Sequence, residues 1–272
     1  MTAPTATASG GARAVPFTAT LASEWIKLWT LPFTRRMLLL AVALSGAAAA
    51  VFTLTTAVTE GTALADMPPI DAAGASLLGA DLATIVLVIL AASNVASEYT
   101  TGMIRLTLAT TPRRWRTLAA KAVVLTGTAL AGGGVATLVA YGVGRLVLLA
   151  QDVPALGMGD PELLRLMMGS TLMAPFYALL AVAMAFVVRN TGGAVVLVLA
   201  VMSVPALVKA LPGWWHDTLL PWLPASALHS LSGSTTVDAA EYLPAGLAAL
   251  VLALWAAALL AAANAALSRR DG

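Results

Sequence analysis

Long runs without a charged residue alternate with short polar segments along this chain. The runs cover residues 37–59, 82–97, 122–144, 166–188, 190–208 and 242–268. Because an α-helix rises about 1.5 Å per residue, about 20 residues cross the ~30 Å hydrocarbon layer of a membrane. The second run reaches this length when it extends back to Ser76. The pattern predicts an all-α membrane protein with six transmembrane helices, at about 37–58, 76–97, 121–146, 165–188, 190–210 and 242–267.

The segment before the first span has a different periodicity. In residues 18–31, TATLASEWIKLWTL, apolar side chains including Trp25 and Trp29 recur on one side of a helix, and Glu24 and Lys27 lie on the other. This predicts a short amphipathic helix at the membrane interface, with tryptophan at headgroup depth. A plain linker to the first span is the alternative.

The segment between the fifth and sixth spans is also unusual. Residues 211–241 are too apolar for a solvated loop, and Pro212, Pro221 and Pro224 interrupt any helix long enough to cross the membrane. Non-helical backbone at membrane depth must be buried in protein or line a cavity. We therefore expect a re-entrant or interfacial segment here.

Composition divides the chain into a tail and one membrane domain. Residues 1–17 are rich in Thr, Ala, Ser, Gly and Pro and are expected to be disordered. Residues 18–272 form the six-span domain. Of the whole chain, 60% is hydrophobic and only 10% charged, against about 25% charged in soluble domains. The net charge of +2 gives no broad basic field, so nucleic acid is not an expected partner.

The positions of the charges predict the orientation. Cytoplasmic loops of membrane proteins are enriched in Lys and Arg. With the N-terminus inside, the outer side holds only three basic residues: Arg145, Arg165 and Lys209. The inner side then holds only three acidic residues: Glu24, Glu98 and Asp271. We expect a multi-pass protein of the plasma membrane with both termini in the cytoplasm.

Several kinds of chemistry have no support in the sequence. It contains no GxxxxGK[ST] phosphate loop, no HExxH metal motif, no GxSxG elbow and no cysteine. We therefore expect no enzymatic activity, cofactor or metal site in this chain. His216 and His229 fall in the Trp- and Pro-rich outer segment, where ordinary interfacial roles explain them.

One pair of charges is a candidate inside the membrane. Asp81 is 17 residues before Glu98, about 25 Å along a helix, and Arg145 lies near the outer end of the third span. Ionisable residues within membranes are usually functional. We expect an Asp81–Arg145 ion pair. The alternative is that both side chains reach the outer headgroups.

The most basic polar segment, residues 97–121, joins the second and third spans. Glu98 lies where the second span leaves the membrane, and Gly102 can end that helix. A short apolar helical turn follows. Thr111 and Pro112 then predict the start of the next helix, as N-cap and first helical residue. A solvated loop that contacts only lipid headgroups is the alternative.

These motifs together resemble the ABC-2-type transporter permeases. The spacing of Glu98, Gly102 and Thr111-Pro112 is similar to the first cytoplasmic loop of that family. The stretch with Glu24, Trp25 and Lys27 resembles its entry helix, and LPWLPASAL at 220–228 resembles its last outer loop. The six-span layout agrees, so the resemblance covers nearly the whole chain.

The resemblance implies a permease subunit of a bacterial ABC exporter. In that family a homodimer or heterodimer of permeases works with separate ATP-binding subunits and exports a substrate, here unidentified, across the bilayer. The ATPase docks on the loop between the second and third spans. Carried over, the docking loop comprises Glu98, Thr100, Thr101, Gly102, Met103, Ile104, Arg105, Leu106, Thr107 and Leu108. Two alternatives remain: a non-transporting scaffold or sensor that binds an ATPase, and an ion-driven secondary transporter.

Overall fold

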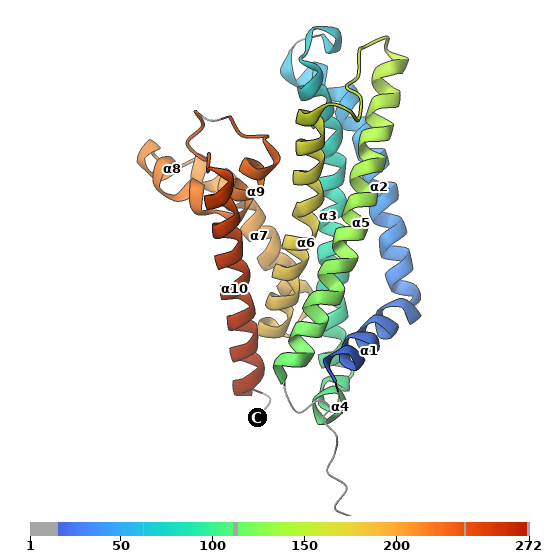
Figure 1. The fold of residues 1–272 in the computed structure, drawn as a ribbon, viewed down its shortest axis with the longest axis vertical. Coiled ribbons are helices and arrows are strands. Elements are labelled where there is room, and N and C mark those ends of the chain that lie inside the picture. Colours follow the sequence, from blue (N-terminus) through green and yellow to red (C-terminus); the bar gives the residue numbers. More distant parts are fainter. Residues whose placement is uncertain (1–15, 62, 111–113, 237, 271–272) are drawn as a thin grey trace, which may run out of the picture.

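The chain is an all-α membrane protein with six helices that are long and apolar enough to cross a bilayer (Figure 1). The computed structural model describes residues 16–61, 63–110, 114–236 and 238–270, and no strand occurs within them. The spanning helices are α2 (Pro32–Glu60), α3 (Pro69–Thr100), α5 (Arg114–Ala150), α6 (Pro161–Val188), α7 (Thr191–Lys209) and α10 (Ala245–Arg270). The short helices are α1 (Phe17–Thr30), η1 (Leu64–Asp66), α4 (Met103–Thr110), α8 (Gly213–Leu219), η2 (Leu220–Trp222) and α9 (Pro224–Ser232).

The six predicted spans are confirmed, and most are longer than the charge-free runs. α2 already begins at Pro32, because proline suits the first helical position. α6 begins at Pro161, where Oδ1 of Asp160 accepts hydrogen bonds from the backbone N–H groups of Glu162 and Leu163. α1 includes Phe17, so the helix begins one residue earlier than predicted. Residues 1–15 of the expected tail, and the expected cap at Thr111 and Pro112, lie outside the described residues.

Four helices, α2, α3, α5 and α6, form the central bundle, with α3 in contact with each of the other three. In α3, 67% of the apolar 18-residue stretch that would cross the membrane is buried. Small residues permit the close packing: a Cβ atom added to Gly133 of α5 would lie 2.6 Å from Cβ of Ala174 on α6. The glycine cluster in the third span is thus used for helix contact.

A second group of helices packs against one side of this bundle (left in Figure 1). α7 contacts α6 and α3, and α10 contacts α6 and α9. In α7 and in α10, only 17% of the apolar 18-residue stretch that would cross the membrane is buried. Their exposed side chains include Leu207, Leu250 and Leu254. In a membrane protein such a surface contacts lipid or another apolar chain. The segment between the fifth and sixth spans forms α8, η2 and α9, of which α9 is almost completely buried.

The two ends of the bundle carry opposite charge. The end that holds α1, α4 and the last residues of α10, called the basic end here, carries Lys27, Arg35, Arg36, Arg114, Arg116, Lys121, Arg189 and Arg269. The other end, with η1, α8 and α9, is called the acidic end. It carries Asp66, Asp71, Asp152, Asp160, Glu162, Asp217, Asp238 and Glu241. Most of the charge thus lies at the two ends of the spanning helices.

Candidate functional site

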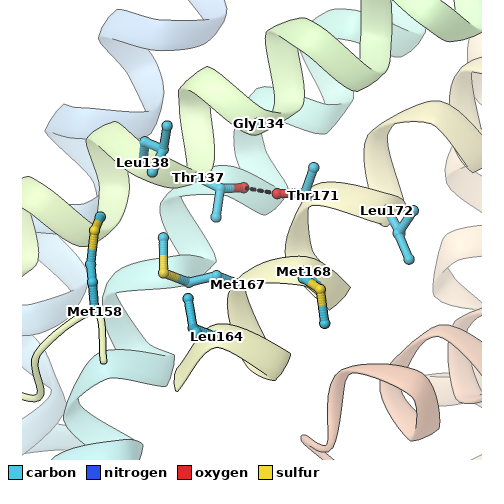
Figure 2. Close-up of a pocket in the computed structure, with 9 residues that line it drawn as sticks. All are labelled: Gly134, Thr137, Leu138, Met158, Leu164, Met167, Met168, Thr171 and Leu172. Atoms are coloured by element: carbon cyan, nitrogen blue, oxygen red, sulfur yellow. Dashed lines mark hydrogen bonds between the residues drawn. The ribbon is translucent and has the colours of Figure 1, made fainter. Parts of the chain in front are cut away.

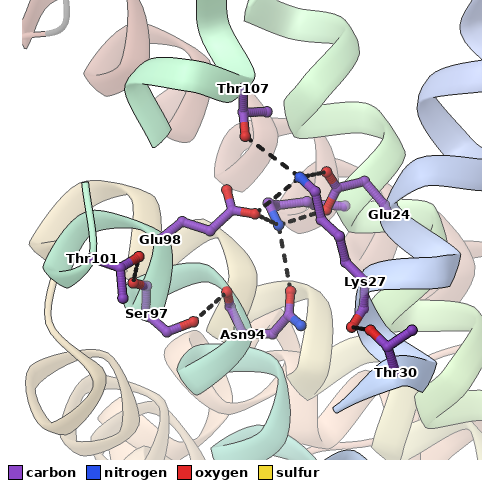
Figure 3. Close-up of polar contacts among 9 residues, drawn as sticks. Glu24, Lys27, Thr30, Asn94, Ser97, Glu98, Thr101 and Thr107 are labelled. Carbon is purple, nitrogen blue, oxygen red and sulfur yellow. Dashed lines mark hydrogen bonds and ion pairs between the residues drawn. The ribbon is translucent and has the colours of Figure 1, made fainter. Parts of the chain in front are cut away.

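Four charged side chains from three helices meet at the basic end (Figure 3). Glu24 and Lys27 come from α1, Glu98 from the last turns of α3, and Lys121 from the second turn of α5. We call this group the four-charge cluster. Its two carboxylates and two ammonium groups balance, so the cluster carries no formal net charge.

Each lysine of the cluster bridges both glutamates. Nζ of Lys121 lies 2.6 Å from Oε2 of Glu24 and 2.9 Å from Oε1 of Glu98. Nζ of Lys27 lies 2.7 Å from Oε1 of Glu24 and 3.2 Å from Oε1 of Glu98. The four charges therefore form a closed ring in which each ammonium group lies between two carboxylates and each carboxylate lies between two ammonium groups.

The cluster is shielded from solvent to different degrees. The side chains of Lys121, Glu24 and Glu98 are 1%, 3% and 7% exposed, whereas that of Lys27 is 28% exposed. Ion pairs at this depth recover little more than their desolvation cost, but loss of one partner is expensive because it leaves a buried charge uncompensated. The buried side chains of Lys121, Glu24 and Glu98 thus link α5, α1 and α3. Lys27 is the member of the cluster that is most exposed to solvent.

The ionisation of the α1 residues follows from these contacts. Burial alone would raise the pKa of Glu24, but Lys121 and Lys27 outweigh it and lower this pKa below its ordinary value. Burial alone would lower the pKa of Lys27, but Glu24 and Glu98 outweigh it and raise this pKa. Both groups are therefore charged across the neutral range.

Two polar side chains extend the cluster. Oδ1 of Asn94, one turn before Glu98 on α3, accepts a hydrogen bond of 3.4 Å from Nζ of Lys121. Oγ1 of Thr107 on α4 accepts one of 3.4 Å from Nζ of Lys27. Four helices thus share one polar network. Within the described part of the chain, Oε2 of Glu98 is buried and has no hydrogen-bond partner.

The turn between α3 and α4 positions the contact with Thr107. The Thr100 and Thr101 hydroxyls both donate to the carbonyl of Ser97 and close the end of α3. Gly102 then has a φ of +72°, a left-handed conformation that glycine adopts without strain. The expected helix end at Gly102 and the short helix after it are both confirmed.

α4 has one anchored side and one exposed side. Ile104 is 6% exposed and belongs to the main apolar core, while Met103 and Leu106 are 44% and 71% exposed. Among the residues expected in the docking loop, Arg105 and Leu108 are placed on this helix by their backbone alone. α4 therefore presents apolar side chains outward at the basic end while it remains fixed to the bundle.

α1 is amphipathic as predicted, and the side that faces the protein holds Leu28 as well as polar residues. Thr20 and Glu24 are buried against the bundle, whereas Trp25 is 49% exposed. Trp25 and Trp29 pack with ring centroids 5.4 Å apart, and Trp29 is partly buried against the main apolar core. α1 thus presents Trp25 and Ile26 outward, and its charged residues are used for internal contacts rather than for solvation.

Asp81 and Arg145 are both described, and they do not form the expected ion pair. Arg145 is exposed on α5, and its Nη1 donates to the hydroxyl of Tyr141 at 3.1 Å. Asp81 instead lines a small cavity between α3, α6 and α9, near His229. Gly144, next to Arg145, packs against Ser76, five residues before Asp81 on α3, so the two charges lie at different levels of the bundle.

A larger cavity between α5 and α6 is apolar, and no charged side chain is among the residues that line it (Figure 2). Its volume is about 390 Å³, and leucine and methionine side chains dominate the lining. Its one internal hydrogen bond joins the hydroxyls of Thr171 and Thr137 at 3.2 Å. In the described residues no group of three or more His, Cys, Asp or Glu could hold a metal ion.

Sequence reasoning missed two members of the network, Lys121 and Asn94. The positive-inside rule explains any lysine next to a cytoplasmic loop, so Lys121 did not stand out. A signal was present, however. Lys121 is followed by a charge-free run, and Glu24 and Glu98 are two of the three acidic residues that the orientation leaves on the basic side. An acid retained among basic residues indicates a specific partner.

Neither a scan against protein-family models nor a search of curated proteins found a match for this chain. The function must therefore be argued from the site itself.

Proposed function

We propose that this chain is the permease subunit of an ATP-driven exporter, moved by a separate ATP-binding subunit that docks on α4. The basic end would face the cytoplasm, with both termini inside and the chain in the plasma membrane. The charge asymmetry between the two ends supports this orientation. The absence of a phosphate loop from the sequence is consistent with a separate motor.

The polar network that joins α4 to the bundle is the observation that carries the proposal. Thr107 on α4 contacts Lys27, and Lys27 contacts both glutamates of the four-charge cluster. Because loss of one partner of a buried pair costs about 3–5 kcal/mol, the cluster resists separation. A displacement of α4 would then carry α1 and the nearby ends of α3 and α5 with it.

The exposed side of α4 supports docking of a partner at this position. Met103 and Leu106 point outward, at an end of the bundle that basic residues surround. ATP binding to the partner can shift the permease only if it favours one arrangement of these helices over another. The α4 contact provides a place where such a preference could act.

The flank of α7 and α10 supports assembly with a second permease. Only 17% of the apolar membrane-crossing stretch of each helix is buried, so a second copy or a related chain could cover the exposed apolar side chains. The exported molecule would then pass between the two permeases.

Two measurements test the proposal together. Affinity purification from the native membrane is expected to recover an ATP-binding protein in stoichiometric amount. Inverted vesicles containing both proteins, given a cell extract, are expected to accumulate at least one solute, detected by mass spectrometry, only with hydrolysable ATP. Hydrolysis without accumulation would indicate the scaffold function instead. Accumulation that follows an ion gradient without ATP would indicate a secondary transporter.

A further inference from the structure

A small polar cavity lies among apolar side chains near the acidic end. It has a volume of about 80 Å³, and its walls come from α3, α6 and α9. The polar lining consists of Asp81, Ser170, His229, Ser232 and Ser234. Since a single water needs roughly 10–15 Å³ of such volume, the cavity can hold a small polar group but not a whole drug-sized molecule.

The sequence builds this cavity by fixing α9 against α6. Gly169 allows the approach, because a Cβ atom there would overlap Ser232. Nε of Arg165 donates to the carbonyl of Leu231 at 3.2 Å, and its Nη2 donates to that of Ser230 at 3.1 Å. These charge-assisted bonds hold the last turn of α9. His229 and Ser232 are thereby held at the cavity that Asp81 lines.

Asp81 has no basic partner among the described residues. Within the described residues its carboxylate has no hydrogen bond or ion pair. Asp81 lies 17 residues from Glu98 in one helix, about 25 Å at 1.5 Å per residue, so with Glu98 at one boundary it lies inside a ~30 Å hydrocarbon layer. A carboxylate at this depth is costly without a counter-ion.

The surrounding charged groups do not supply that counter-ion. Arg145 bonds to Tyr141, and Arg165 is occupied by the carbonyls of α9. Lys209 pairs with Glu241 at 3.0 Å. Burial, aided by Lys209 and opposed by Glu241, lowers the pKa of His229, so its imidazole is mostly neutral at pH 7.

We propose that this cavity binds the protonated primary or secondary amine of an amphipathic molecule, with Asp81 as counter-ion and the serine hydroxyls as hydrogen-bond acceptors. Leu78, Leu166 and Met173 border the same cavity and suit the apolar part next to the amine. Metal ions fit poorly, because Ca²⁺ and Mg²⁺ require six or more oxygen ligands. The amine belongs either to a lipid headgroup or to an amphipathic solute.

The proposal concerns binding and does not depend on ATP-driven export. The test uses the full chain in phosphatidylcholine nanodiscs, because that headgroup carries no N–H donor. The probe is a dansyl-labelled primary alkylamine, compared with the alcohol of the same chain length. We expect the amine to bind about tenfold tighter than the alcohol. Asp81→Asn should abolish that preference, and Asp71→Asn, the same change at an exposed position of α3, should preserve it.

If Asp81→Asn does not fold, the affinities of the amine and the alcohol for the unchanged protein still test the site. Equal affinities of the two probes would overturn it, as would a folded Asp81→Asn variant that still prefers the amine. A third arm exchanges the lipid for phosphatidylethanolamine. Weaker amine binding there identifies the headgroup as the occupant, and unchanged binding identifies a solute; both results support the site.

Discussion

Nζ of Lys121 lies 2.6 Å from Oε2 of Glu24, although the two residues are 97 positions apart in the chain and their side chains are only 1% and 3% exposed. This contact joins the helix before the first span to the start of the third. Because α5 packs against α2, α3 and α6, the contact links α1 to the whole central bundle.

Lys121→Met is expected to destabilise the protein strongly. The substitution keeps most of the side-chain volume but leaves Glu24 and Glu98 as neighbouring buried carboxylates with only Lys27 between them. Removal of one partner from a buried pair costs about 3–5 kcal/mol. The measurement is the free energy of unfolding, or the melting temperature, in a fixed detergent.

The control for this substitution is Lys209→Met. Lys209 also pairs with a glutamate, Glu241 at 3.0 Å, but its side chain is 54% exposed, and exposed pairs contribute about 0–1 kcal/mol. A Lys121→Met variant no less stable than Lys209→Met would show that the cluster does not hold the helices together.

Stability is expected to fall at both extremes of pH. The lowered pKa of Glu24 stabilises the fold above its unfolded value near 4.5, and this contribution is lost as the pH falls through the folded pKa. The raised pKa of Lys27 stabilises the fold below about 10.5, and this contribution is lost as the pH rises through the folded pKa. Melting curves should give a plateau between them. Glu24→Gln should flatten the acid limb. Because Glu24 is also the main cause that raises the pKa of Lys27, this variant should weaken the alkaline decline as well; an unchanged acid limb would contradict the assignment.

Patterns along the chain were sufficient to predict the spans but not the contacts of the charged residues. The charge-free runs locate all six spanning helices because hydrophobic length is a local property. Gly102 marks the end of α3 for a similar reason, since its left-handed φ of +72° depends on one residue. The predicted short helix before the first span exists, but which of its sides faces the protein could not be read from its periodicity.

Long-range partners could not be predicted because they depend on helix register. Asp81 and Arg145 belong to spans that pack together, yet Arg145 is exposed and bonds to Tyr141. Asp81 faces α9, whose position relies on Gly169 and Arg165. Those contacts arise between segments 60 or so residues apart, and no local rule specifies them.

Gly102→Ala is expected to weaken coupling to the ATPase. Nothing lies within 4 Å of an added Cβ atom, so the cost comes only from the left-handed φ, about 1–2 kcal/mol for a residue with a side chain. Relief of this strain would extend α3 and turn α4 away from Lys27. We expect the ATP hydrolysis of the co-purified partner to lose most of its stimulation by the permease, measured as phosphate release.

The matched control is Gly127→Ala in α5. Its added Cβ atom also meets nothing within 4 Å, but its backbone is helical, where alanine is favoured by up to about 1 kcal/mol. Stimulation should persist in this variant. Equal stimulation in Gly102→Ala would leave the α3–α4 turn with a purely structural role.

Arg165→Met is expected to loosen α9 and, through it, the amine cavity. The two bonds from Arg165 to the carbonyls of Leu231 and Ser230 are each charge-assisted, and such bonds contribute about 1.5–3 kcal/mol. Hydrogen–deuterium exchange should therefore rise across residues 224–232 while α3 stays protected. Arg145→Met, which removes one bond to Tyr141 from an exposed arginine, should leave that exchange unchanged. Because Asp81 itself is intact, a looser α9 should also reduce the preference for amine over alcohol, whereas unchanged exchange in α9 would mean that packing at Gly169 alone holds this helix.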